Sequence, residues 1–216
     1  MSKTTLAGAG ALLAAPILVI VATLVRPTVS EDAADQVAAL TDHRGAVIAG
    51  LAIGVVAAVL LIAGTVWLAA AVASYGRNLA LWGGILGVLG MLVVLFEDGV
   101  TAAAPSVVGV LDPAQATAVV DRIGSSAGVE AVEPVSIVAA IGLTLLAIGV
   151  VRAGCARIAA ASLAIGAFVE TAGFATGTRA VVVVGFVLLF LGSAAAVRTL
   201  TAAPRRRASA ETVPAL

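Results

Sequence analysis

Six apolar runs account for most of this 216-residue chain, and they constrain its fold more than any motif does. The hydrocarbon core of a bilayer is roughly 30 Å thick, and about 20 apolar residues in a helix cross it. The runs lie at residues 6–25, 46–73, 79–100, 135–151, 158–175 and 180–197. We therefore predict an all-α, polytopic membrane protein in which a bundle of six transmembrane helices occupies residues 1–197.

The composition argues against a soluble helical domain. Hydrophobic residues make up 62% of the chain and charged residues 11%, whereas a soluble domain has roughly 25% charged residues. Residues 51–63 and 181–191 are apolar on every side, but a surface helix of a soluble protein needs one polar face. The formal net charge of zero gives no sign of a nucleic-acid partner. We expect membrane lipids, and no nucleic acid, as partners.

The basic residues predict the orientation, because loops on the cytoplasmic side of a membrane are enriched in Lys and Arg. With a cytoplasmic N-terminus, the inner side holds Lys3, Arg77, Arg152, Arg157, Arg198, Arg205, Arg206 and Arg207. Trp67, Tyr75 and Trp82 then fall near the inner ends of two spans, where aromatic rings favour the headgroup zone. We predict a multi-pass protein of the cell (plasma) membrane with both termini in the cytoplasm.

The first run, residues 6–25, follows Lys3 and has a signal peptide as its alternative. It is longer than a typical signal h-region, and no small-residue cleavage site with a polar mature start follows near Val25. We expect it to remain as a membrane span.

Two loops, after the first and third spans, contain segments that predict short helices on the outer surface. In the first loop, Ser30 precedes acids of the kind that stabilise a helix N-terminus. In the second, Asp112, Pro113 and Gln115 provide an N-cap, a proline at the first helical position and a Gln at the third. Both segments end in similar polar turns, so an internal repeat of span, surface helix and span is left open.

Three further connections are short enough to join antiparallel helices, and they lie at residues 74–78, 152–157 and 176–179. Beyond the last span, residues 198–216 lack an apolar face and carry Arg205 to Arg207. We predict a disordered, basic cytoplasmic tail that contacts anionic lipid, with binding of a partner as the alternative.

Small residues recur at a spacing that lets helix backbones approach closely, at Gly50 and Gly54 and at Gly83 and Gly87. Such contacts serve either packing within the bundle or an interface between copies. The sequence therefore leaves a homo-oligomer or a membrane partner protein open.

Glu170 is the most unusual polar residue, because it lies inside the fifth predicted span, about 20 Å along the helix from Arg157. An ionisable group at membrane depth is costly and by default indicates a functional site, often on an ion or proton path. Two hypotheses remain open. Glu170 is either a proton or cation site, or one half of a structural clamp with Arg26, Arg44 or Arg179.

Glu97 and Asp98 stand at the end of the third predicted span. They are either ordinary interface acids or, if the helix continues beyond Gly99, carboxylates drawn below the surface towards Glu170. Three converging acids would form a cation or proton site, in which desolvation and mutual repulsion disfavour the charged forms.

A polar turn of Asp42, His43 and Arg44 lies at the predicted outer mouth of the second span. The single histidine cannot ligate a b-type haem from both sides, and it excludes the paired-histidine zinc motif; a capping or interface role is expected. Cys155 is the one cysteine and cannot form an intrachain disulfide. No phosphate loop or Ser/His/Asp set stands out. We therefore predict no catalytic residue, no cofactor and no metal site.

The layout of the chain resembles small uncharacterised six-span membrane proteins of actinobacteria, which are grouped under a domain of unknown function. The resemblance rests on the apolar first span, the turn at residues 41–45, the hairpin at residues 76–80 and the acid pair of Glu97 and Asp98. It covers most of the chain and implies a fold type but no activity. The makeup, rich in Ala, Val, Gly and Arg and poor in Lys, is typical of a high-GC bacterial genome.

These observations favour a non-enzymatic, multi-pass integral membrane protein that acts as a scaffold, sensor or accessory subunit. The alternative is a small transporter or channel for a cation or proton that uses Glu170 with Glu97 and Asp98. An intramembrane enzyme is the least favoured, because no nucleophile and base lie at membrane depth.

Overall fold

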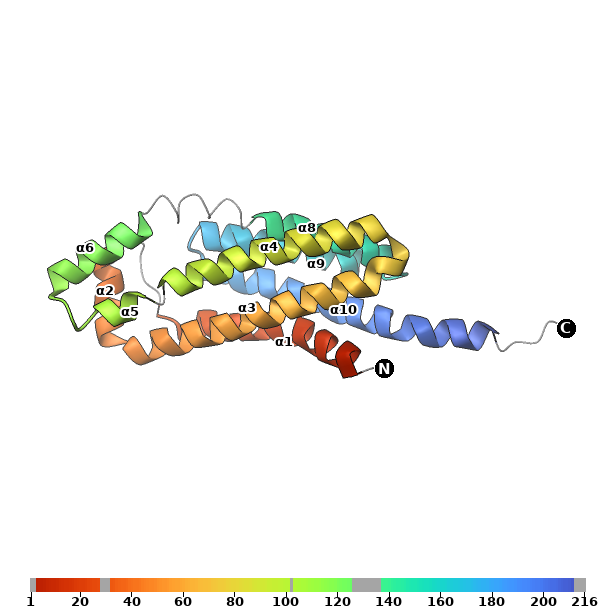
Figure 1. Cartoon of the computed structure of the whole chain (residues 1–216), viewed down its shortest axis with the longest axis horizontal. Coiled ribbons are helices and arrows are strands. Elements are labelled where there is room, and N and C mark those ends of the chain that lie inside the picture. The colour runs from red at the N-terminus through yellow and green to blue at the C-terminus, as the bar shows by residue number, and fades with distance from the viewer. Residues whose placement is uncertain (1–2, 28–31, 102, 126–136, 212–216) are drawn as a thin grey trace.

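The computed structural model describes residues 3–27, 32–101, 103–125 and 137–211, apart from the side chains of residues 97, 98, 100, 101 and 203–211. The regular elements of these residues are all helices (Figure 1). Five of them are long and apolar enough to cross a membrane, namely α1 (Lys3–Val25), α3 (Arg44–Val72), α4 (Arg77–Thr101), α9 (Arg157–Ala175) and α10 (Arg179–Glu211). A further apolar helix, α8 (Ile137–Arg152), is shorter. These helices support the prediction of a membrane protein.

The six apolar helices form a ring whose order follows the chain, from α1 through α3, α4, α8 and α9 to α10, which returns to α1. Three pairs make the most extensive contacts: α1 with α3, α4 with α8, and α9 with α10. In Figure 1 the helices run along the long axis of the molecule, and successive members point in opposite directions. The first helix thus packs between α3 and α10 as an integral part of the ring.

Glycines let these pairs pack with their backbones close together. A Cβ added to Gly142 of α8 would stand 2.7 Å from the Cα of Gly87 in α4, and one added to Gly166 of α9 would stand 2.6 Å from the backbone nitrogen of Leu189 in α10. At Gly83 of α4 the added Cβ would stand 2.9 Å from the side chain of Leu146. The glycines at 83 and 87 are therefore used for packing within the ring, which is one of the two roles predicted for them.

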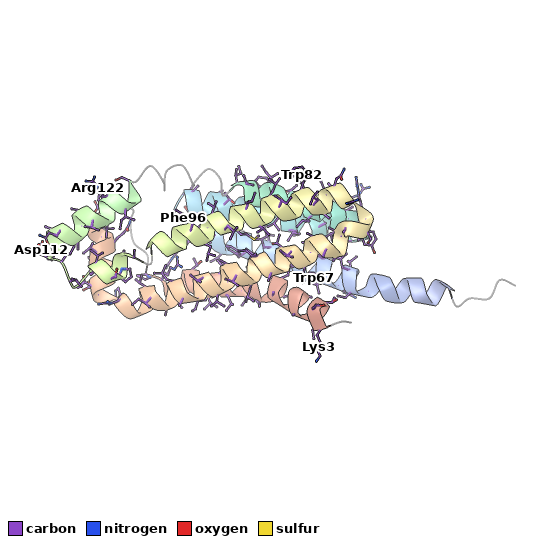
Figure 2. All side chains as sticks on the ribbon, viewed as in Figure 1. Lys3, Trp67, Trp82, Phe96, Asp112 and Arg122 are labelled. Carbon is purple, nitrogen blue, oxygen red and sulfur yellow. The ribbon has the colours of Figure 1, made fainter. Side chains whose placement is uncertain are left out.

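The outer surface of the ring is apolar. Exposed large hydrophobic residues recur along α4 at intervals of three or four residues, at Leu81, Ile85, Leu89, Leu92 and Phe96. The other apolar helices expose similar side chains, which project from the ring in Figure 2. Soluble monomers rarely expose apolar patches larger than a few hundred Å². A surface of this kind is suited to lipid.

Two of the predicted tight connections reverse at a glycine. Gly177 has φ +62°, and the N–H of Thr178 donates to the carbonyl of Gly173 at 2.9 Å. Gly154 has φ +97°, and the N–H of Cys155 donates to the carbonyl five residues before it at 3.2 Å. This is the hydrogen bond of a Schellman turn, which needs a residue in the left-handed region that glycine adopts without strain.

Three short helices form a second unit, here called the cap, at one end of the ring (Figure 1). They are α2 (Ala33–Asp42), α5 (Ala104–Val107) and α6 (Pro113–Gly124). The cap has its own cluster of buried apolar side chains, formed by Val37, Leu40, Ala104, Val108, Ala116 and Val120. Val47 of α3 packs against this cluster, and Arg44 of α3 donates a hydrogen bond to the carbonyl of Pro105 at 3.2 Å. The first turn of α3 thus fixes the cap to the ring.

An aspartate is the N-cap residue of each of the two longer helices in this unit, α2 and α6. The side chain of Asp112 accepts hydrogen bonds from the N–H groups of Ala114 and Gln115, each at 3.1 Å, as the sequence predicted. In α2, however, the N-cap is Asp32, which accepts from Ala34 at 2.7 Å. The sequence predicted Ser30 in this role, and that residue lies outside the described part of the chain. Both residue types are strong N-caps, so the composition alone did not separate them.

Lys3 and the far end of α10 lie at the end of the ring opposite the cap (Figures 1 and 2). Disorder was predicted from residue 198, but the backbone of α10 is helical to Glu211. Ala and Arg are strong helix formers, and adding a residue to an existing helix is far easier than starting one. These residues therefore continue α10 beyond the ring, and residues 212–216 lie outside the described part.

Candidate functional site

Glu170 is a predicted site residue in the middle part of an apolar helix of the ring, α9. It lies on α9 on the same face as Leu163, Gly166, Ala167 and Gly173, which are all buried. Its own side chain is partly buried. Because a helix turns about 100° per residue, this face points away from the exposed side of α9. Glu170 therefore belongs to the packed side of the helix and not to the surface that lipid would cover.

The backbone of Glu170 lies directly against α10. A Cβ added to Gly185 would stand 2.5 Å from the backbone nitrogen of Glu170 and 2.6 Å from its Cβ. The missing side chain at Gly185 thus provides the space in which the base of the Glu170 side chain sits. Glu170 lies five residues before the end of α9 at Ala175, which is about 8 Å along the helix. The carboxylate is therefore near the cap end of the ring.

Hydrogen bonding to Glu170 is weak. Among the described residues, its carboxylate accepts one hydrogen bond, from the hydroxyl of Thr171 at 3.5 Å. The same hydroxyl lies 2.8 Å from the carbonyl of Ala167. A hydroxyl has a single proton to donate, so the shorter bond to Ala167 dominates. The described residues therefore give the carboxylate little hydrogen-bonding support at a position where a charge is costly.

Two of the three arginines proposed as clamps for Glu170 donate to backbone carbonyls. Arg44 bonds to Pro105 in the cap, and Arg26 lies 3.3 Å from the carbonyl of Gly50 in α3. A Cβ on Gly50 would collide with the Arg26 side chain, so this glycine makes room for it. The clamp with Glu170 stays a prediction.

The predicted partner acids lie at the end of α4. The helix continues past Glu97 and Asp98 to Thr101, and α5 begins at Ala104. The extension of the helix beyond Gly99, which was one of the two alternatives, is therefore present. The side chains of Glu97 and Asp98 lie outside the described part, so their convergence on Glu170 stays a prediction.

The polar turn at the start of α3 connects two helices. The N–H of His43 donates to the carbonyl of Ala39 in α2 at 2.8 Å, and its carbonyl accepts from Val47 in α3 at 3.1 Å. The side chains of Asp42, His43 and Arg44 are exposed. In the part of the chain that the structure describes, no three His, Cys, Asp or Glu side chains gather as a metal site would require.

Two buried polar residues of the ring were not singled out from the sequence. Thr65 of α3 is fully buried, and its hydroxyl lies 3.5 Å from the sulfur of Met91 in α4. Ser193 of α10 is almost fully buried as well. Both sit within continuous apolar runs, and small hydroxyl residues are common where transmembrane helices pack. Only the positions of the neighbouring helices reveal that they face inward.

Comparisons of the chain with protein-family models, with curated proteins and with solved structures give no match. The class that the fold defines is a helical membrane protein with a ring of apolar helices and a small helical cap. The resemblance to six-span actinobacterial proteins stays a prediction.

Proposed function

We propose that this chain is a six-span protein of the cell membrane with both termini in the cytoplasm, and that it acts without catalysing a reaction, as a scaffold, sensor or accessory subunit. The cap then lies on the outer side. Most basic residues lie at the opposite end, which the enrichment of Lys and Arg on the cytoplasmic side favours.

The sixth span in this proposal is α8. Its 16 described residues correspond to about 24 Å of helix, and they begin at the first residue after an undescribed stretch. Ile137, Ile141 and Ile148 are exposed on one side of α8. Large apolar residues are exposed in the same way on the helices long enough to cross a membrane. α8 also packs along α4 between its neighbours in the ring. A helix with this surface and these neighbours is suited to lipid over its whole length.

The observation that carries the non-enzymatic role is the close packing inside the ring. The buried cluster of the ring draws six residues from α8 alone, namely Ala139, Ala140, Leu143, Leu146, Ala147 and Val150. The helices on either side contribute further apolar side chains, and glycines bring the backbones into contact. A protein that holds partners in place needs such a rigid bundle, with the cap as its exposed unit.

The second candidate is a small transporter or channel for a cation or a proton, in which Glu170 acts together with Glu97 and Asp98. The placement of Glu170 favours it, because the carboxylate lies on the packed side of α9 with one weak hydrogen bond in the described part of the chain. A carboxylate at this depth needs a proton or a cation to offset its desolvation.

Flux measurements on the purified protein in liposomes separate the two candidates. The scaffold proposal predicts proton and potassium fluxes equal to those of empty liposomes, and Glu170→Gln then changes stability or assembly alone. Flux above the empty liposomes that Glu170→Gln abolishes contradicts the scaffold role and supports the transporter, provided that the control Ser162→Ala, on the same helix with its hydroxyl bonded to the carbonyl of Ile158, leaves the flux in place.

A further inference from the structure

The charges of the molecule are strongly divided between its two ends. The end of the ring opposite the cap, here called the basic end, exposes Lys3, Arg77, Arg152, Arg157 and Arg198. The acids whose side chains are described lie in the cap, in its connection to α3, or towards the cap end of α9: Asp32, Asp35, Asp42, Asp112, Asp121 and Glu170. The basic end therefore has no described acid of its own to neutralise it.

Two arginines of the basic end lie at the same level of a helix pair. In the antiparallel pair of α4 and α8, Gly83 lies against Leu146 and Gly90 against Ala139. Continuing this register to the end of the pair puts Arg77, the first residue of α4, opposite Arg152, the last residue of α8.

A direct contact supports the same register. The Nη1 atom of Arg152 lies 3.2 Å from the position that a Cβ on Gly76 would occupy, and Gly76 immediately precedes Arg77. The absence of a side chain at Gly76 thus lets the guanidinium of Arg152 lie against the start of α4. Both arginine side chains are exposed.

Neither guanidinium is neutralised by a residue that the structure describes. In the described residues, no hydrogen bond or ion pair joins Arg77 or Arg152 to another residue. Like charges held at neighbouring positions repel each other. An anion between them removes this repulsion, and a phosphate matches the planar fork of a guanidinium particularly well.

The surface beside the two arginines is suited to the rest of a lipid. About one turn deeper, Leu81 of α4 and Ile148 of α8 are exposed at 53% and 42%, and the α4–α8 register puts them at the same depth. Trp82, which follows Leu81 in α4, is exposed at 56%, and tryptophan rings favour the membrane interface. The site therefore offers two positive charges at the headgroup level and an apolar surface directly below.

We propose that Arg77 and Arg152 together bind the phosphate of an anionic phospholipid whose acyl chain lies against Leu81 and Ile148. Basic sites between transmembrane helices are a known means of recognising anionic headgroups. The phosphate offsets the repulsion between the two guanidiniums and joins the ends of α4 and α8. This inference goes beyond the proposed function and requires only that the ring is embedded in a membrane.

Native mass spectrometry of the detergent-purified full chain tests the site directly. The protein is offered phosphatidylglycerol or phosphatidylcholine of the same acyl composition. The wild type should retain phosphatidylglycerol at least about tenfold better, since each arginine near a headgroup contributes roughly 1 kcal/mol and 1.4 kcal/mol is a factor of ten. The double variant Arg77→Gln, Arg152→Gln should lose this preference, and the double Lys variant at the same positions should recover most of it.

The matched control removes the same charge from the same end. Arg157→Gln with Arg198→Gln should keep the preference for phosphatidylglycerol. An equal loss in this control, or no preference in the wild type, overturns the site. All variants should remain in the membrane fraction of cells. A wild-type chain that is not in that fraction contradicts the membrane proposal instead, so the two failures are distinguishable.

Discussion

Single glycines determine how closely the helices of the ring approach one another. At Gly142 an added Cβ would meet the backbone of Gly87 on the facing helix, which cannot move without separating α4 from α8. Gly10 of α1, by contrast, has nothing within 4 Å of such a Cβ. The same substitution therefore has different consequences at the two positions.

Gly142→Ala should destabilise the protein by about 1–3 kcal/mol, the usual cost of forcing an extra group into a packed interior. Gly10→Ala should be neutral or slightly stabilising, because alanine is the better helix former. Thermal unfolding of the detergent-purified variants measures both. Equal unfolding temperatures for the two variants would show that α4 and α8 are not in the contact described.

The direction of Glu170 illustrates which residue-level features the sequence does not determine. Its depth follows from counting residues along an apolar run. The helix that Glu170 contacts does not follow from such counting, because nearly every side of α9 is apolar and polarity does not distinguish one face from another. Only packing shows that the buried side of α9 includes Glu170 and that Gly185 of α10 provides its space.

At the scale of elements, the two cap helices were predictable because their local signals resemble those of soluble helices. Asp112 followed by Pro113 correctly predicted the start of α6. The predicted N-cap residue of α2 was Ser30, but the N-cap is Asp32, two residues later. Several residues of N-cap type stand close together there. α5 was not predicted, since four residues between two loops carry little periodicity.

Asp112→Ala should weaken α6 by about 1 kcal/mol, because two N–H groups of its first turn lose their acceptor. Hydrogen exchange of the α6 amides should accelerate by roughly fivefold, as that free energy implies. Asp121→Ala is the control: this acid lies in the last turn of α6 and is exposed, where a negative charge is unfavourable for the helix dipole. Similar acceleration of hydrogen exchange in both variants would rule out the N-cap role of Asp112.

For the whole molecule, the apolar runs predicted the ends of the long helices to within a few residues, except for the tail of α10. This was possible because a lipid-exposed helix must be apolar over its length, so the ends of an apolar run mark the ends of the helix. The arrangement of the helices in a ring and the formation of the cap were not predictable. They depend on which of several similar apolar faces meet, and on contacts between α2 and α6, which lie far apart in the sequence.

The number of crossings is the central claim, and cysteine labelling in intact cells tests it most directly. In a Cys155→Ser background, single cysteines replace Ala118 in α6, Ser74 between α3 and α4, or Thr176 between α9 and α10, which are all exposed. With six spans and a cytoplasmic N-terminus, a membrane-impermeant thiol reagent should label positions 118 and 176 in intact cells and position 74 only after permeabilisation. Position 176 is decisive for α8, because it moves to the inner side if α8 does not cross. Labelling of positions 118 and 176 from opposite sides would contradict the six-span account.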